Sequence, residues 1–323
     1  MLKNAKLITK NASPLDYLKE DKKRGDRGFF TSSSMLRRFL WCPSKWLAGE
    51  EDEETKSKIF GSLFDCQLLV PDQFEERYAV KPLTYPDKTT GDPKEWSANS
   101  TWCKDWLKRH ASFDIVSNDD LEQSNLAIKR LLANDTLKSF LADSDRQVWL
   151  VAEWHDPKTG IVIPIKVMLD VVPRIGTEFE KSLGDLKSTV SAALMPFNRQ
   201  LFKFGWHTQA ALYQDVYMAA TGEDRPTYCL FGVENKAPFE PFRRMVSDNF
   251  LMIGRRTYTH ALGLYARCLK TGFWPSYDDH RDAIQGWTLC EPEPWMEFTA
   301  MEEAMEQQQE SALAETENDD VPT

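Results

Sequence analysis

The chain lacks the features that mark membrane, secreted and disulfide-built proteins. No apolar run in its 323 residues approaches the roughly 18 needed to cross a bilayer, and residues 1–10 contain no hydrophobic signal core. The six cysteines are scattered without a C-x-x-C pair, which argues against zinc ribbons and thioredoxin-type sites. We therefore expect a cytoplasmic protein with no membrane contact, whose cysteines are buried free thiols.

Basic residues are missing from the C-terminal end. The net charge is −10, but residues 291–323 contain 11 acidic residues and no lysine or arginine. Subtracting these 11 from the 50 acidic residues leaves 39 against 40 basic ones, so the rest of the chain is nearly neutral and can carry a local basic surface. Residues 291–323 also lack the apolar content of a core, and we expect a largely disordered acidic tail.

The first half of the chain shows mainly helical patterns. Residues 1–27 are polar and predict a mobile arm or a few short turns, with order beginning near Phe29. Apolar residues then recur with helical spacing in four segments, the first of which Pro43 ends or kinks: residues 31–46, 59–69, 99–110 and 121–141. Residues 83–96 are rich in Pro, Gly, Asp and Thr and predict a long loop.

The middle of the chain changes to the period of strands. Residues 147–154 and 161–172 are β-branched or aromatic runs joined by the turn sequence H-D-P-K-T-G, which predicts a hairpin. A third strand (179–187), a long helix (196–221), a strand (227–233) and a helix (243–271) follow. This order predicts a central mixed β-sheet flanked by helices, in one α/β domain over residues 28–290 with a helical part (28–145) and a sheet part (146–290).

Charged residues fall on the predicted neighbouring strands. Asp170 lies near the end of the second strand, Glu153 near the end of the first, and Asp185-Leu186-Lys187 in the third. Side chains at i and i+2 of a strand share a face, so Asp185 and Lys187 project together, toward Asp170 if the strands are neighbours. Phosphodiester hydrolysis uses metals held by carboxylates and a nearby cation.

The Asp-x-Lys pattern alone is weak evidence for a nuclease site. Asp/Glu-x-Lys occurs at least seven times here, including Asp156 to Lys158, so edge-strand carboxylates with a solvated lysine stay an open alternative. Gln209 and Tyr213 are four apart on the following helix and share a face, which by itself is typical of ordinary surface residues. The joint order Asp, Asp-x-Lys, Gln-x-x-x-Tyr, however, resembles the PD-(D/E)xK nuclease superfamily, specifically its RecB-like branch with the Q-x-x-x-Y motif.

Further segments resemble the RecE-like exodeoxyribonuclease VIII group over roughly residues 30–280. S-S-S-M-L-R-R-F-L-W-C-P-S-K-W (32–46) looks like the opening helix of the group, and G-F-W-P-S-Y (272–277) matches its late motif. The segment 61–74 is similar to the Gly-x-x-x-His helix, but Asp65 stands where the group usually has a metal-ligating His. An oxygen ligand suits Mg²⁺ or Mn²⁺ well. Because of this exchange of His for Asp, a weakened or inactive enzyme stays an open alternative.

The resemblance implies a restriction-endonuclease-like core with an N-terminal helical extension, and roles for individual residues. Metal ligands would be Asp170, Asp185, the carbonyl of Leu186 and Asp65, with Glu153 completing or bracing the site. Lys187 would orient the attacking water, and Gln209 and Tyr213 would position the DNA strand or brace the site. Candidates for DNA contact are Lys166, which could equally be a solvated strand lysine, and Arg37, Arg38, Lys203 and His207. Four tryptophans fit base stacking or, more often, helical core packing: Trp41, Trp46, Trp102 and Trp106.

The function implied is an Mg²⁺-dependent exonuclease, with Mn²⁺ as an alternative ion, that degrades linear double-stranded DNA from 5′ ends and leaves 3′ overhangs for annealing. The group suggests a RecT-like single-strand annealing protein or a host single-strand-binding protein as partner, and a homo-oligomeric ring. Two alternatives stay open. One is a catalytically weakened scaffold that binds DNA ends, and the other is a CRISPR-associated RecB-like nuclease without the clustered Fe–S cysteines usual there.

Overall fold

The computed structural model describes residues 1–49, 55–279 and 291, and divides the chain into two compact units. The first unit, Met1–Trp274, contains all the helices and strands of the described residues. Of the second unit, which begins at Pro275, only residues 275–279 and Glu291 are described. The acidic tail predicted for residues 291–323 therefore lies, Glu291 apart, outside the described residues.

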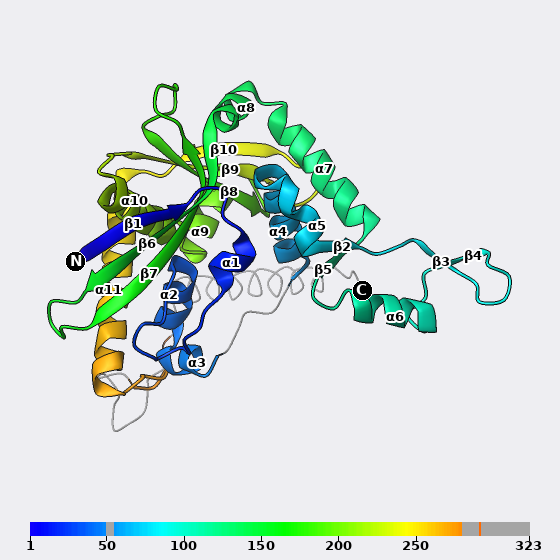
Figure 1. The fold of residues 1–323 in the computed structure, drawn as a ribbon. Coiled ribbons are helices and arrows are strands. Elements are labelled where there is room, and N and C mark those ends of the chain that lie inside the picture. Colours follow the sequence, from blue (N-terminus) through cyan, green and yellow to red (C-terminus); the bar gives the residue numbers. More distant parts are fainter. Residues whose placement is uncertain (50–54, 280–290, 292–323) are drawn as a thin grey trace, which may run out of the picture. The chain divides into compact units, whose positions relative to one another are not determined.

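A six-stranded mixed sheet forms the centre of the first unit (Figure 1). Its strands, in spatial order, are β1 (Leu2–Thr9), β6 (Ser144–His155), β7 (Val162–Pro173), β8 (Ser182–Thr189), β9 (Thr227–Glu234) and β10 (Pro241–Met245). Neighbours are antiparallel except β8 and β9. These two are parallel because the chain crosses over between them through two helices, α9 (Leu194–Lys203) and α10 (Trp206–Thr221).

Helices cover the sheet on both sides. Residues of β9 alternate between two apolar clusters, with Tyr228 and Leu230 in one and Phe231 and Val233 in the other. The first cluster includes residues of α2 (Ser33–Trp41), α3 (Pro43–Leu47), α9, α10 and α11 (Asp248–Thr271). The second includes residues of α4 (Lys56–Leu69), α7 (Asn118–Leu132) and α8 (Asp135–Ala142). The predicted fold class, a central mixed sheet flanked by helices, is confirmed.

Several predicted helices are divided by local backbone features. The helix expected at residues 196–221 is two helices, because Gly205 between α9 and α10 has a left-handed φ of 69°. Asn134 caps α8 by accepting a hydrogen bond from the Leu137 N–H, which separates α8 from α7. The Cys42-Pro43 step separates α2 from α3. The predicted hairpin of β6 and β7 is confirmed.

The expectation of a mobile N-terminal arm is wrong. Residues 2–9 form β1, which pairs antiparallel with β6, and α1 (Pro14–Leu18) follows it. The ring of Tyr17 on α1 packs edge-on against Trp149 of β6, with centroids 5.9 Å apart. β1 was missed because it is an irregular edge strand whose side chains are mostly exposed, so its sequence lacks the alternation of a half-buried strand.

Residues 71–116 connect α4 to α7 through short elements. These are a 3₁₀ turn (Pro71–Gln73), α5 (Phe74–Arg77), β2 (Tyr78–Val80), β3 (Thr84–Pro86), β4 (Pro93–Glu95), α6 (Thr101–Arg109) and β5 (Asp114–Val116). The predicted loop at 83–96 thus contains the small β3/β4 hairpin. Of the five described cysteines, four are buried: Cys42, Cys66, Cys103 and Cys268. Within the described residues, no helix has the length and apolarity to span a bilayer.

Candidate active site

Asp170 and Asp185 meet where β7 and β8 separate. The two strands pair at Val171 and Gly184, and beyond this point the N–H of Leu186 donates to Asp170 Oδ2 at 2.8 Å instead of to a strand carbonyl. Gln147 of β6 donates to the other oxygen of Asp170 at 3.3 Å. Asp185 is only 1% exposed. Burial, and then the charge of Asp185, raise the pKa of Asp170 well above its ordinary value, so the two carboxylates lie close together as expected.

Lys187 places a positive charge against these carboxylates. Its ammonium forms an ion pair with Asp185 Oδ2 and lies 5.9 Å from the ring centroid of Trp206. Burial alone lowers the pKa of Lys187, but the charges of Asp185 and Asp170 outweigh that effect and raise the pKa above its ordinary value. Lys187 therefore remains a cation near neutral pH.

Asp65 approaches the same group from α4. Gly61 precedes it by one helical turn on the same helix face, and a Cβ at Gly61 would lie 3.0 Å from the hydroxyl of Ser188 on β8. The glycine thus lets α4 pack closely on β8 and brings Asp65 near the site. Burial, and then the charge of Asp185, raise the pKa of Asp65 to about 7, although Lys187 opposes the shift.

Gln209 and Tyr213 on α10 brace the site from the first apolar cluster. Gln209 Nε2 donates to Asp185 Oδ1 at 2.8 Å, which leaves Oδ2 of that carboxylate to Lys187. Tyr213 is buried in the first apolar cluster, and burial raises its pKa well above the ordinary value, so it stays a neutral phenol. Gln209 thus fixes a carboxylate directly, whereas Tyr213 packs in the core beneath the site.

Two predicted site residues lie elsewhere. Glu153 is six residues along β6 from Gln147, about 20 Å at the rise of an extended strand, and it accepts hydrogen bonds from Asn4 and His155. It therefore neither completes nor braces the site. Lys166 is 2% exposed and its ammonium donates to the carbonyl oxygen of Tyr17 at 2.9 Å. Both earlier interpretations of Lys166, a phosphate contact and a solvated lysine, are wrong because the unpredicted α1 segment covers it.

Three of the other four DNA-contact candidates line one pocket. Arg37, Lys203 and His207 line a common pocket between α2, the α9/α10 junction and α11, and Arg38 is next to Arg37 on α2. His207 is 4% exposed and stacks on Phe202 with centroids 5.0 Å apart. Burial lowers the pKa of His207, so it is neutral near pH 7 and the predicted phosphate contact is not available to it.

The donor set fits a divalent metal ion. Asp185 Oδ2 is buried and, apart from its ion pair, accepts no hydrogen bond. The N–H and C=O of one strand residue point to the same side, so the Leu186 carbonyl faces Asp170 as its N–H does. Two carboxylates and a carbonyl are hard oxygen donors of the kind Mg²⁺ prefers. Over the described ranges no three His, Cys, Asp or Glu side chains form a metal-ready cluster. Burial is the main cause of the raised pKa of Asp170 and the charge of Asp65 adds to it, so Asp65 lies near the other two carboxylates and its role as a third ligand stays a prediction.

Sequence reasoning missed three residues that shape the site. Gln147 holds Asp170 from a backbone with a positive φ of 42°, and Trp206 flanks Lys187. Gly232 lets β9 approach β8, since a Cβ there would lie 1.7 Å from the carbonyl oxygen of Lys187. No local motif distinguishes these residues, because each acts across strands that are distant in the sequence.

Comparison with known proteins agrees with this architecture. Residues 32–286 match the model of a family described as "PDDEXK-like domain of unknown function (DUF3799)". The crystal structure of a "Putative exonuclease" from Eubacterium rectale is similar with a TM-score of 0.51 and 16% identity, over 90% of this chain and 98% of that chain. At this identity the similarity concerns the fold alone. No curated protein matches the chain. Because the family match spans most of its length, the chain belongs to the DUF3799 family of PDDEXK-like domains, within the PD-(D/E)xK superfamily.

Proposed function

We propose that this protein is a metal-dependent exonuclease that degrades linear double-stranded DNA from its 5′ ends, in the manner of the RecE-like group. The observation that carries the proposal is the convergence of Asp170, Asp185 and a cationic Lys187 at the opening between β7 and β8. Membership of a PDDEXK-like family supports nuclease chemistry. The order of motifs along the chain supports the RecE-like group, and the 5′ direction is taken from that resemblance.

Asp170, Asp185 and the carbonyl of Leu186 would hold Mg²⁺, with Mn²⁺ as an alternative. When bound, the ion supplies Lewis-acid polarisation of the scissile phosphate. Lys187 stays protonated beside the carboxylates, so it orients the attacking water through a donated hydrogen bond and offsets negative charge that develops on phosphorus. Gln209 keeps Asp185 in one orientation so that these groups need not rearrange during reaction.

Asp65 lies close to the site, and with its pKa raised to about 7 by burial it is only partly ionised near neutral pH until a cation binds beside it. In this proposal it strengthens the attraction for a cation and takes the place of the usual His. The same geometry favours the second candidate, a weakened nuclease that binds DNA ends, because the His that would ligate directly is missing. The two candidates differ in whether the native chain cleaves DNA.

The test is digestion of linear duplex DNA labelled separately at its 5′ and 3′ ends, with Mg²⁺, Mn²⁺ or EDTA. A closed circular duplex serves as the control for endonuclease activity. Lys187→Ala removes the cation from the site. Lys158→Ala is a matched control, because Asp156 to Lys158 repeats the Asp-x-Lys pattern on the exposed β6/β7 turn.

The expected result is metal-dependent loss of 5′ label from linear DNA alone, abolished by Lys187→Ala and retained by Lys158→Ala. Release of 3′ label first would refute the 5′ polarity. Cleavage of the circle would refute exonuclease action, because a closed circle has no ends. If the native chain is inactive with both ions and Asp65→His restores cleavage, the end-binding scaffold replaces this proposal.

The exonuclease would leave 3′ single strands. We propose a RecT-like annealing protein or host single-strand-binding protein as the partner that receives them, and a ring of subunits around the duplex. Both rest on the RecE-like resemblance. Co-elution with the annealing protein and sedimentation of the intact chain test them, and a monomer that elutes alone would contradict them.

A further inference from the structure

The face of the first unit formed by α2, α9 and the start of α10 carries an exposed tryptophan beside a pocket. We propose that this face binds single-stranded DNA, with one unpaired base stacked on Trp41 and phosphates near Arg37 and Lys203. The inference rests on the proposed nuclease function, since it names the path of a separated strand next to the active site.

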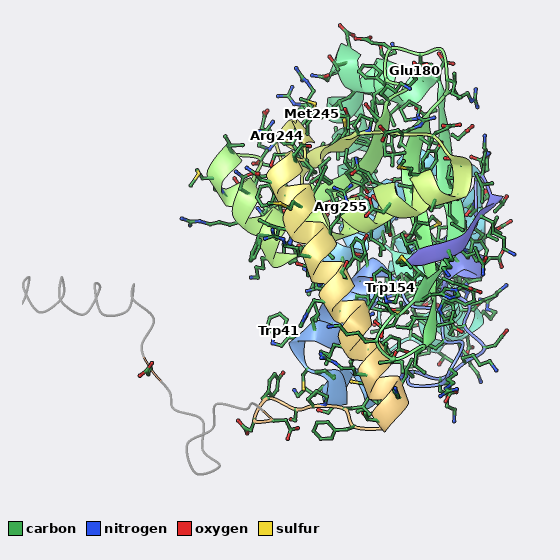
Figure 2. All side chains as sticks on the ribbon, turned by 90° about the vertical axis from the view of Figure 1, so that its left-hand side faces the viewer. Trp41, Trp154, Glu180, Arg244, Met245 and Arg255 are labelled. Carbon is green, nitrogen blue, oxygen red and sulfur yellow. The ribbon has the colours of Figure 1, made fainter. Side chains whose placement is uncertain are left out.

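Trp41 differs from the other tryptophans considered as stacking candidates. Trp46 is buried in the first apolar cluster, Trp106 is 8% exposed, and Trp102 is half-buried with its ring stacked on Tyr85, whereas Trp41 is 68% exposed at the end of α2. Figure 2 shows its side chain pointing away from the body of the unit beside α11. Phe202 on α9 is 58% exposed and lines the same pocket. Large aromatic side chains with this exposure are suited to stacking on a flat ring.

The pocket between them has an apolar floor and basic walls. It has a volume of about 290 Å³ and is lined by Leu36, Leu40 and Ala261 together with Arg37 and Lys203. The stem of Arg37 packs on Gly205, where a Cβ would lie 3.2 Å from Arg37 Cδ. This close approach joins α2 to the start of α10, so residues far apart in the sequence form one surface.

The two helices α2 and α9 contribute only basic charged residues to this face. α2 contributes Arg37 and Arg38, α9 contributes Arg199 and Lys203, and neither helix contains an acidic residue. The chain without its acidic tail is nearly neutral, so this concentration of positive charge is local. Such a surface attracts a phosphate backbone.

The start of α10 connects the pocket with the active site. Gly205, His207 and Thr208 line the pocket, whereas Trp206 lies beside Lys187 and Gln209 donates to Asp185. Phe204 extends the aromatic contact outward, with its ring centroid 5.7 Å from that of Trp206. A strand leaving the carboxylates would therefore reach the pocket within about one turn of α10.

The exposed aromatic rings favour an unpaired strand over a duplex. In a duplex the faces of the bases are stacked on each other, so an aromatic side chain on a protein surface can stack only on a base that has been separated. The phosphates of a duplex could meet the basic walls, but they would leave Trp41 without a role. An acidic peptide is the other ligand that a basic, apolar surface could take, and the experiment includes it.

The test is the affinity of the full-length protein for fluorescein-labelled oligo(dT), measured by anisotropy in EDTA so that cleavage does not interfere. Trp41→Ala is expected to raise Kd roughly 5- to 150-fold, the range for one lost stacking interaction, while Trp41→Phe retains most of the affinity. Lys203→Ala should reduce the slope of log K against log salt by about 0.7. Lys88→Ala, an exposed lysine between β3 and β4, is the matched control and should leave both quantities unchanged.

Native Kd for oligo(dT) in Trp41→Ala would overturn the inference. So would binding of a labelled polyglutamate peptide that depends on Trp41 while oligo(dT) binding does not. Digestion of duplex DNA is measured in parallel. Active digestion without Trp41-dependent binding overturns the inference alone, and Trp41-dependent binding without any digestion overturns the proposed nuclease function alone.

Discussion

Replacing Gln209 with alanine tests whether α10 holds the carboxylate of Asp185 in its working orientation. Gln209 Nε2 donates to Asp185 Oδ1 at 2.8 Å, and Asp185 is almost fully buried. The substitution removes a hydrogen bond to a charged acceptor that water cannot easily replace. We expect the free energy of unfolding to fall by about 1.5–3 kcal/mol.

The effect on catalysis should exceed the effect on stability. A carboxylate that has lost its orienting partner holds a metal less well, and removal of such a supporting hydrogen bond typically costs about 10- to 100-fold in activity or metal affinity. Cleavage of linear duplex DNA at saturating Mg²⁺ measures the activity, and urea unfolding in EDTA measures the stability. A larger activity loss at low Mg²⁺ would locate the defect in metal binding.

Gln214 supplies the matched control on the same helix. Gln214 is buried, whereas Gln209 is half-buried, and Gln214 Nε2 donates to the carbonyl oxygens of Arg225 and Pro226 at 3.0 and 2.9 Å, away from the carboxylates. Gln214→Ala should cost a similar free energy of unfolding, about 1–3 kcal/mol for two neutral hydrogen bonds, with activity retained. Equal activity losses in the two variants, or full activity in Gln209→Ala, would refute the reasoning.

Three further variants test the packing of the site, the burial of a histidine and a buried cation. Gly232→Ala puts a Cβ 1.7 Å from the Lys187 carbonyl oxygen, and it should lower the free energy of unfolding in urea by about 3 kcal/mol and abolish the nuclease activity. Gly263→Ala, in the interior of α11 with its nearest neighbour at 3.9 Å, should keep the activity and stabilise the fold by up to about 1 kcal/mol, because alanine favours a helix over glycine. Burial lowers the pKa of His207, so the unfolded chain binds more protons than the native one and the free energy of unfolding falls as the pH drops below about 6.5. Unfolding measured between pH 5 and 8 should show a smaller decrease of this free energy in His207→Gln. Arg225→Ala removes a buried guanidinium that donates to Pro173 and Ser182 carbonyl oxygens, and a loss below about 1 kcal/mol by thermal unfolding would contradict its structural role.

Much of the fold could be predicted because its signals are local. Two apolar runs and a turn sequence indicate the β6/β7 hairpin, and the ends of both strands lie within three residues of the expected ranges. The helix boundaries were less accurate, because Gly205 and Asn134 end helices inside continuous apolar patterns. β1 could not be predicted, since its apolar residues do not alternate with polar ones and its stability comes from pairing with β6, about 150 residues away in the sequence.

Among the site residues too, those with a local sequence signal could be predicted, and those placed by long-range contacts could not. Asp170, Asp185 and Lys187 were found because strand spacing and the Q-x-x-x-Y resemblance single them out. Glu153 was placed wrongly because a position near a strand end does not tell toward which end of the sheet it lies. In the antiparallel hairpin Glu153 is opposite Pro164, far from Asp170.

By itself, the sequence determined which residues share a face of one element. Asp185 shares a strand face with Lys187, and on helices Gln209 shares a face with Tyr213 and Gly61 with Asp65. These relations depend only on the repeat of a single element. Only the tertiary structure decided which of the Asp-x-Lys copies meets a second carboxylate, that α1 covers Lys166, and that Trp41 remains exposed while Trp46 is buried. Each of these outcomes depends on contacts between segments distant in the chain, and the period of a single segment carries no information about its partner.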